Sequence, residues 1–152
     1  MDLITLDFET YYDKEYSLIK MTTEEYVRDP RFEVIGVGVK LNNNDTEWAS
    51  GTNDQIRQFL QAFDFQAACV LAHNTMFDGA ILNWRYDINP RFYTDTLCIA
   101  RAVDGVEVSG SLRALAERYS LGAKGTEVTD AIGKHRSDFT EEELSRYGDY
   151  CI

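Results

Sequence analysis

The sequence predicts a single α/β domain in which helices flank a mixed sheet, and three observations lead to that prediction. A strand-like apolar run opens the chain at Leu3–Thr10, and a second run, β-branched and nearly free of charge, follows at Phe32–Lys40. A short apolar strand at Ala68–Ala72 then lies between segments whose apolar residues recur at helical spacing. At 152 residues the chain can bury most of its apolar surface in one domain without disulfides or a structural metal.

Composition favours a globular protein of a reducing compartment. Apolar residues make up 44% of the chain and aromatic residues 12%, which is too apolar for a disordered chain. Cys69, Cys98 and Cys151 are scattered in apolar contexts without a C-x-x-C pair, so we expect buried thiols and no zinc site. We expect no signal peptide, because Met1 and Asp2 lead directly into a strand, and no membrane partner, because no apolar run could span a bilayer. These features predict a cytoplasmic protein.

The net charge of -11 excludes one class of nucleic-acid binder. A protein that holds duplex through a broad basic face relies on Lys and Arg to neutralise phosphates, and this chain lacks that excess. Nucleic acid remains possible as a substrate. A site that grips phosphate through divalent cations needs acidic residues, and a short single-stranded end can be held by aromatic stacking.

The first strand, Leu3–Thr10, is followed by a polar and aromatic stretch, Tyr11–Lys20, for which we expect an irregular loop. Thr22–Glu25 is a capping-box pattern that begins a short helix. The pair Asp29-Pro30 ends it, because the residue before proline is disfavoured in helical conformation.

A β-hairpin follows. Phe32–Lys40 is predicted to be a buried strand, and its Gly36 and Gly38 indicate that a neighbouring group approaches closely. The turn signal Asn42–Asp45 connects it to a partner strand at Thr46–Ser50.

Asn53 or Asp54 is expected to cap the next helix, whose apolar residues have helical spacing. Those residues are Ile56, Phe59, Leu60 and Phe63. The strand Ala68–Ala72 then delivers the chain to His73–Asp78, and a helix through Ala80–Trp84 follows.

The last third of the chain is predicted to be mainly helical. Phe92 and Tyr93 form a brief strand, Asp95 caps a helix, and Ser111–Tyr119 forms another helix. Gly122–Asp138 is glycine-rich and charged, so we expect a mobile loop. A second capping box at Thr140–Glu143 begins the last helix.

This order of elements is that of the ribonuclease H-like α/β fold: a three-stranded antiparallel meander and then a helical crossover to a strand parallel to the first. The crossover places Ala72 at the same end of the sheet as Asp7 and Glu9. Open α/β sheets carry their sites at that end.

Three carboxylates are therefore candidate site residues. Asp7 and Glu9 project from the same face of a strand, because side chains alternate, and two such acids either raise one pKa or bind a hard cation. Asp78 lies near the start of the helix that follows the parallel strand. Taken alone, the first pair is compatible with a solvated strand end, and Asp78 with a partner of the helix dipole.

Two motifs carry a family resemblance. Asp7–Thr10 resembles the first motif, and Asn74–Asp78 the second, of the DnaQ-like, or DEDD, 3′-to-5′ exonucleases, and most closely the proofreading domain of phage-type family A DNA polymerases. The segments Thr22–Gly38, Asp95–Leu97 and Ser111–Ala116 are also similar to that group, so the resemblance covers nearly the whole chain.

The third motif of that family is Tyr-x-x-x-Asp or His-x-x-x-x-Asp, and here the sequence departs. His135 has Thr140 at the required position, and Tyr147 has Cys151.

Tyr150 is the anchor we expect, because Tyr-Cys-Ile resembles the start of this motif, and its Asp would follow two residues after Ile152. Asp149 points about 100° away from Tyr150 around a helix and is expected to be solvated. We therefore expect residues 1–152 to be one exonuclease domain, a fragment that ends within the third motif.

The resemblance implies hydrolysis with two bound ions, Mg²⁺ or Mn²⁺, which suit oxygen ligands. Asp7 would bridge both ions, Glu9 would bind the ion that activates water, Asp78 would support the second ion through its waters, and Tyr150 would orient the nucleophile.

Thr10 and Asn74 would contact the substrate, with Phe77 mainly a packing residue. The implied partners are a single-stranded 3′ end of DNA and a covalently linked polymerase domain, in a bacterial or phage-infected host cell.

Other candidates keep two interpretations each. His73 either contacts phosphate or is a hydrogen-bonded residue at a strand end, and Asp95 either binds metal or caps a helix. A tyrosine cluster either stacks on bases or forms core, and a basic run either steers DNA or is a solvated loop. The cluster is Tyr11, Tyr12 and Tyr16, and the run is Lys124, Lys134, His135 and Arg136.

Three functions follow from the sequence. The first is the proofreading exonuclease domain of a DNA polymerase. The second is a stand-alone exonuclease of the same superfamily that acts on RNA or small nucleic acids. The third is a catalytically silent domain that retains the fold as a scaffold or nucleotide-binding module, since the fourth carboxylate is absent from this chain.

Overall fold

The computed structural model describes residues 1–122 and 131–151, and its centre is a 5-stranded sheet in the order β3-β2-β1-β4-β5. β1, β2 and β3 are antiparallel neighbours, whereas β4 runs parallel to β1 and β5 parallel to β4. The predicted mixed sheet, with its meander and crossover, is confirmed. The strands are β1 Asp2–Thr10, β2 Val34–Leu41, β3 Glu47–Ala49, β4 Ala68–Ala72 and β5 Phe92–Asp95.

The helices begin close to the predicted positions. Both capping boxes form, with the Thr22 and Thr140 hydroxyls accepting from the backbones of Glu25 and Glu143. One prediction is wrong: Thr52, with Gln55, caps the second helix in place of Asn53 or Asp54, because it forms a reciprocal box. The helices are α1 Thr23–Arg28, α2 Asn53–Leu60, α3 Thr75–Tyr86, α4 Thr96–Asp104, α5 Leu112–Tyr119 and α7 Glu141–Cys151, with a 3₁₀ turn at Arg136–Asp138.

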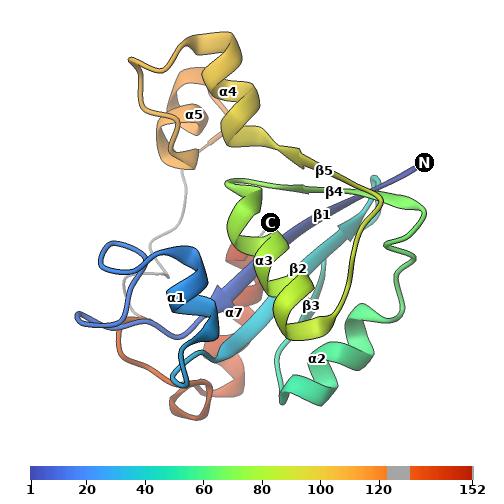
Figure 1. Ribbon diagram of the computed structural model, residues 1–152, viewed down its shortest axis with the longest axis vertical. Helices are drawn as coiled ribbons and strands as arrows, with labels where there is room; N and C mark the ends of the chain where they lie inside the picture. The colour runs from blue at the N-terminus through green and yellow to red at the C-terminus, as the bar shows by residue number, and fades with distance from the viewer. Residues whose placement is uncertain (123–130, 152) are drawn as a thin grey trace.

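Helices cover the sheet from both sides (Figure 1). On the side of α2 and α3, Phe8 of β1 stacks on Tyr86 with ring centroids 5.9 Å apart, within the main apolar core. On the side of α7, Leu144 and Tyr147 pack on Ile35 of β2 in a second cluster. α4 and α5 stand clear of the sheet at the top of Figure 1.

Two glycines fix α7 against the sheet. A Cβ on Gly36 of β2 would lie 2.3 Å from the Trp48 ring, and a Cβ on Gly148 of α7 would lie 2.4 Å from the same ring. Trp48 is therefore in contact with both the strand and the helix, which only residues without a side chain permit. The close approach predicted at Gly36 is confirmed.

The segment before α7 is held more firmly than its composition suggested. His135 Nδ1 lies 2.6 Å from Glu33 Oε2, the His135 ring stacks on Tyr11 at 4.0 Å, and the Arg136 backbone donates to Glu33 Oε1. Lys134 pairs with Glu143 at 3.2 Å. This part of the predicted loop is largely exposed, as expected, and it is also bonded to Glu33 from a distant part of the sequence; Lys124 lies outside the described residues.

Among the described residues, no helix combines the length and the apolar character needed to cross a bilayer.

Candidate active site

The site begins where β1 separates from β4. β1 pairs with β4 only from Asp2 to Thr5, while its pairing with β2 continues to Thr10. The chain turns into α3 at Thr75, beyond the end of β4. This arrangement leaves the last residues of β1 beside the first turn of α3, so the sheet end predicted to carry the site brings the two exonuclease-like motifs together.

Asp78 links the two motifs directly. The Phe8 N–H donates to Asp78 Oδ1 at 3.0 Å, so the carboxylate takes the place of a neighbouring strand. Asp78 is only 2% exposed, and burial, then the charge of Asp7, and more weakly that of Glu9, raise its pKa well above the usual range. A raised carboxyl pKa means that ionisation here is costly without a compensating positive charge.

α7 brings two further groups to Asp7 and Glu9. Cys151 is 7% exposed, and its Sγ lies 3.7 Å from Asp7 Oδ2 and 3.9 Å from Glu9 Oε1. Burial and then the charges of the same two acids raise the thiol pKa. Tyr147, one turn earlier and 2% exposed, has its pKa raised by burial and by Glu9.

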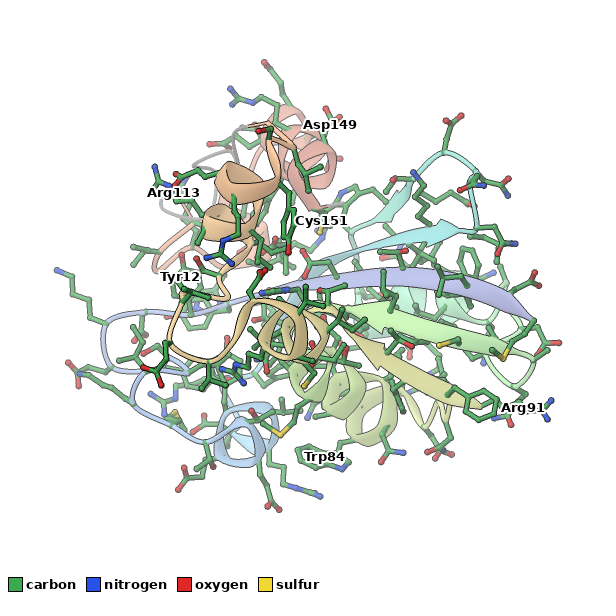
Figure 2. All side chains as sticks on the ribbon, turned by 90° about the horizontal axis from the view of Figure 1, so that it is seen from above. Tyr12, Trp84, Arg91, Arg113, Asp149 and Cys151 are labelled. Atoms are coloured by element: carbon green, nitrogen blue, oxygen red, sulfur yellow. The ribbon has the colours of Figure 1, made fainter. Side chains whose placement is uncertain are left out.

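Tyr147 and Cys151 were not predicted as site residues. Their spacing of one helical turn puts both on one face, which is the signal that the sequence offers, but the third motif of the family has Asp where this chain has Cys151. The Tyr150 side chain, which we predicted to orient the nucleophile, lies outside the described part of the structure. Asp149 is exposed as expected, and Figure 2 shows it at the outer rim of the molecule while Cys151 lies inward, toward β1.

The predicted substrate residues differ in their surroundings. Asn74 is exposed in left-handed conformation (φ 66°) just before α3, where its backbone N–H donates to Asp95. The Thr10 hydroxyl is buried and lies 2.9 Å from the Tyr26 hydroxyl, and Phe77 packs on the core beside Tyr26. Of the three, Asn74 alone is exposed.

For the other candidates, the structure shows the hydrogen-bonded, capping and core positions that the sequence allowed. His73 is hydrogen-bonded to Thr96 at 2.9 Å at the end of β4, and the Asp95 carboxylate accepts the Leu97 N–H as the cap of α4. Tyr11 and Tyr16 are buried and stack on each other, so they belong to the core. Tyr12 is partly buried.

A separate open groove of about 680 Å³ lies between α1 and α3. Its walls are mainly apolar and include Met76, Trp84 and Tyr93. Neither Asp7, Glu9 nor Asp78 lines it, and Figure 2 places Trp84 on the side of the molecule away from Cys151. The groove is therefore distinct from the acidic site.

The donor groups at the acidic site fit a divalent cation. One ligand atom each from Asp7, Glu9 and Cys151 lies within 4.8 Å of the others. Asp78 adds a buried carboxylate that is close enough to Asp7 for the charge of Asp7 to raise the Asp78 pKa. Carboxylate oxygens are the ligands of Mg²⁺ and Mn²⁺. A cation would relieve the repulsion among the three acids.

No family model and no curated protein matches the sequence. Among solved structures, Brucella melitensis NrnC is similar to this chain with a TM-score of 0.68 and 10% identity, over 98% of this chain and 66% of NrnC. NrnC with bound Mg²⁺ and NrnC bound to pGG give TM-scores of 0.67 and 0.66. The chain thus spans about two thirds of the length of NrnC.

The family B DNA polymerase of the archaeon Pyrobaculum calidifontis is also similar, with a TM-score of 0.54 and 16% identity, over 99% of this chain and 21% of the polymerase. At these identities the likeness establishes the fold. The chain therefore has a ribonuclease H-like, exonuclease-like fold.

Proposed function

We propose that this chain is a metal-dependent 3′-to-5′ exonuclease domain that proofreads for a DNA polymerase. The observation that carries the proposal is the convergence of Asp7, Glu9 and Asp78 at one end of the sheet, with the Asp78 pKa raised by burial and by the other two charges. The likeness to an Mg²⁺-bound structure and to a polymerase of which this fold is one part supports it.

Each acid has a role that its position supports. Asp7 would be shared by both ions, Glu9 would hold the ion that activates water, and Asp78 would support the second ion while its Oδ1 stays bonded to Phe8. When bound, Mg²⁺ or Mn²⁺ activates a water molecule and stabilises the leaving oxygen. Tyr150 remains the proposed orienting residue for that water.

The substrate end would approach from the side of Asn74, whose exposed amide can donate to and accept from a nucleotide. Thr10 and Phe77 would act from behind by fixing the loop and the core around Tyr26. Because the chain has a net charge of -11 and no excess of Lys and Arg, we propose that bound cations hold the phosphate. We propose a single-stranded 3′ end of DNA as the substrate and a linked polymerase domain as the partner.

A second candidate is a stand-alone exonuclease that acts on RNA or very short oligonucleotides. The specific observation in its favour is the fold likeness to NrnC, whose structure is known bound to pGG.

One assay separates these functions. Single-stranded DNA, RNA and a dinucleotide, each labelled at the 5′ end, are incubated with the chain and Mg²⁺ or Mn²⁺. A ladder that shortens DNA from its 3′ end supports the proofreading domain, and preferential cleavage of the dinucleotide or RNA supports the second candidate. Degradation at an equal rate after Asp7→Asn would show that the cleavage does not come from this site. No cleavage by a folded, Mn²⁺-binding protein would indicate a silent domain.

A further inference from the structure

Cys151 places a sulfur atom at the acidic site, where a Mg²⁺ centre would use oxygen ligands alone. Its Sγ lies 3.5 Å from the Asp7 carbonyl oxygen and 3.7 Å from the Asp7 carboxylate, on one side of the cluster. Glu9 Oε1 lies 3.9 Å away on the same side. The sulfur therefore faces the same space as the two carboxylates.

The position of the thiol is fixed by the packing of α7. Gly148 lies against Trp48, and Tyr147 is buried beside Glu9, so the helix cannot rotate the thiol away without losing both contacts. Asp7 and Gly38 are paired across β1 and β2, and the Cys151 sulfur donates to the Asp7 carbonyl oxygen of that pair at 3.5 Å. The thiol thus lies against β1 where this strand pairs with β2.

A thiol ligand favours a different class of metal from carboxylate ligands alone. Mg²⁺ takes oxygen ligands and leaves a neutral thiol uncoordinated, whereas Zn²⁺ and Cd²⁺ bind thiolate together with carboxylate. The ligand atoms of Asp7, Glu9 and Cys151 all lie within 4.8 Å of one another, close enough for one ion to contact all three.

We propose that Cys151 determines the metal specificity of this site by forming, with Asp7 and Glu9, a mixed sulfur and oxygen centre that takes a thiophilic divalent cation of the zinc class more tightly than Mg²⁺. The inference rests on the proposed function, because Asp7 and Glu9 are shared. Binding replaces the S–H bond with a bond from sulfur to the metal, and the released proton goes to the buffer.

The test is a Cd²⁺ titration of the metal-free chain, followed by the ultraviolet sulfur-to-cadmium charge-transfer absorbance. The wild-type chain should develop the band, and Cys151→Ser should lose it and bind Cd²⁺ roughly tenfold more weakly or worse. Cys98→Ser is the matched control, because Cys98 is exposed and also lies beside a carboxylate, that of Asp95. It should behave as wild type.

A second variant covers the case in which Cys151→Ser does not fold. Cys151→Asp supplies an oxygen ligand at the same position, so it should bind Mg²⁺ more tightly than wild type and show no charge-transfer band. Circular dichroism of each variant establishes that it is folded.

The outcomes separate this inference from the proposed function. A band that persists in Cys151→Ser, or a wild-type chain that binds Mn²⁺ through Asp7 but shows no band, overturns the role of Cys151 and leaves the exonuclease proposal standing. If Mn²⁺ binding is unaffected by Asp7→Asn, the proposed function itself fails.

Discussion

The backbone N–H of Phe8 donates to the carboxylate of Asp78 at 3.0 Å, across 70 residues of sequence. This bond holds the buried Asp78 carboxylate beside Asp7 and connects β1 to α3, the helix that follows β4. The bond requires only one acceptor oxygen, so it would form equally well if the Asp78 side chain were uncharged. In the metal-free protein the ionised Asp78 carboxylate therefore lowers the stability of the folded state.

Asp78→Asn should stabilise the metal-free protein at neutral pH. Asparagine keeps an oxygen that accepts the Phe8 N–H and removes a buried charge next to Asp7. We expect Tm to rise by a few degrees, since about 1 kcal/mol shifts Tm by about 2–4 °C for a chain of this size. Thermal unfolding in EDTA measures it. Asp87→Asn is the control, because Asp87 is exposed at the end of the same helix and Asn accepts its positive φ; an equal rise in both variants would contradict the explanation.

The same substitution predicts a pH dependence. A carboxyl whose pKa is raised on folding stabilises the folded state fully below its ordinary value of 3.8, and this contribution is lost as pH rises through the folded pKa. The Tm advantage of Asp78→Asn over wild type in EDTA should therefore be smallest in acid and grow toward neutral pH. A constant difference across that range would mean that Asp78 does not titrate as described.

Gly148→Ala should destabilise the protein, although alanine usually favours a helix by about 1 kcal/mol over glycine. The added methyl group would lie 2.4 Å from the Trp48 ring, and such overpacking costs about 1–3 kcal/mol. Urea unfolding measures the difference. Ser145→Ala, on the exposed face of α7, should be neutral or slightly stabilising; a stabilised Gly148→Ala would show that α7 is not packed on Trp48 as described.

Asn74→Gly tests substrate contact without changing the backbone. Glycine adopts the left-handed conformation of this residue readily, so only the amide is lost. We expect KM for a single-stranded substrate to rise about 2- to 10-fold, the effect of one neutral hydrogen bond, with kcat little changed. The control is Asn44→Gly in the exposed turn between β2 and β3. An unchanged KM would remove Asn74 from the substrate site.

Much of this fold could be predicted from local sequence patterns. The alternation around Asp7, the hairpin turn and the capping boxes at Thr22 and Thr140 are local signals, and each was confirmed. Thr52 was missed because two good cap formers, Asn53 and Asp54, follow it directly, and only the pairing with Gln55 distinguishes it.

Tertiary contacts account for the rest. Nothing near His135 indicates that Glu33 will bind it, since the two residues meet only after the sheet has formed. Likewise, the sequence places Cys151 one turn after Tyr147, but its approach to Asp7 depends on the contact between Gly148 and Trp48. Such positions are set by packing between distant segments, which local patterns do not encode.

Whether Asp7 holds a divalent cation can be measured by a Mn²⁺ titration followed by electron paramagnetic resonance. The wild-type chain should bind Mn²⁺ saturably, and Asp7→Asn should bind it at least roughly tenfold more weakly. Asp2→Asn, an exposed acid on the same strand, should match the wild type. Superimposable binding curves for all three proteins would show that Asp7 is not a ligand of the cation.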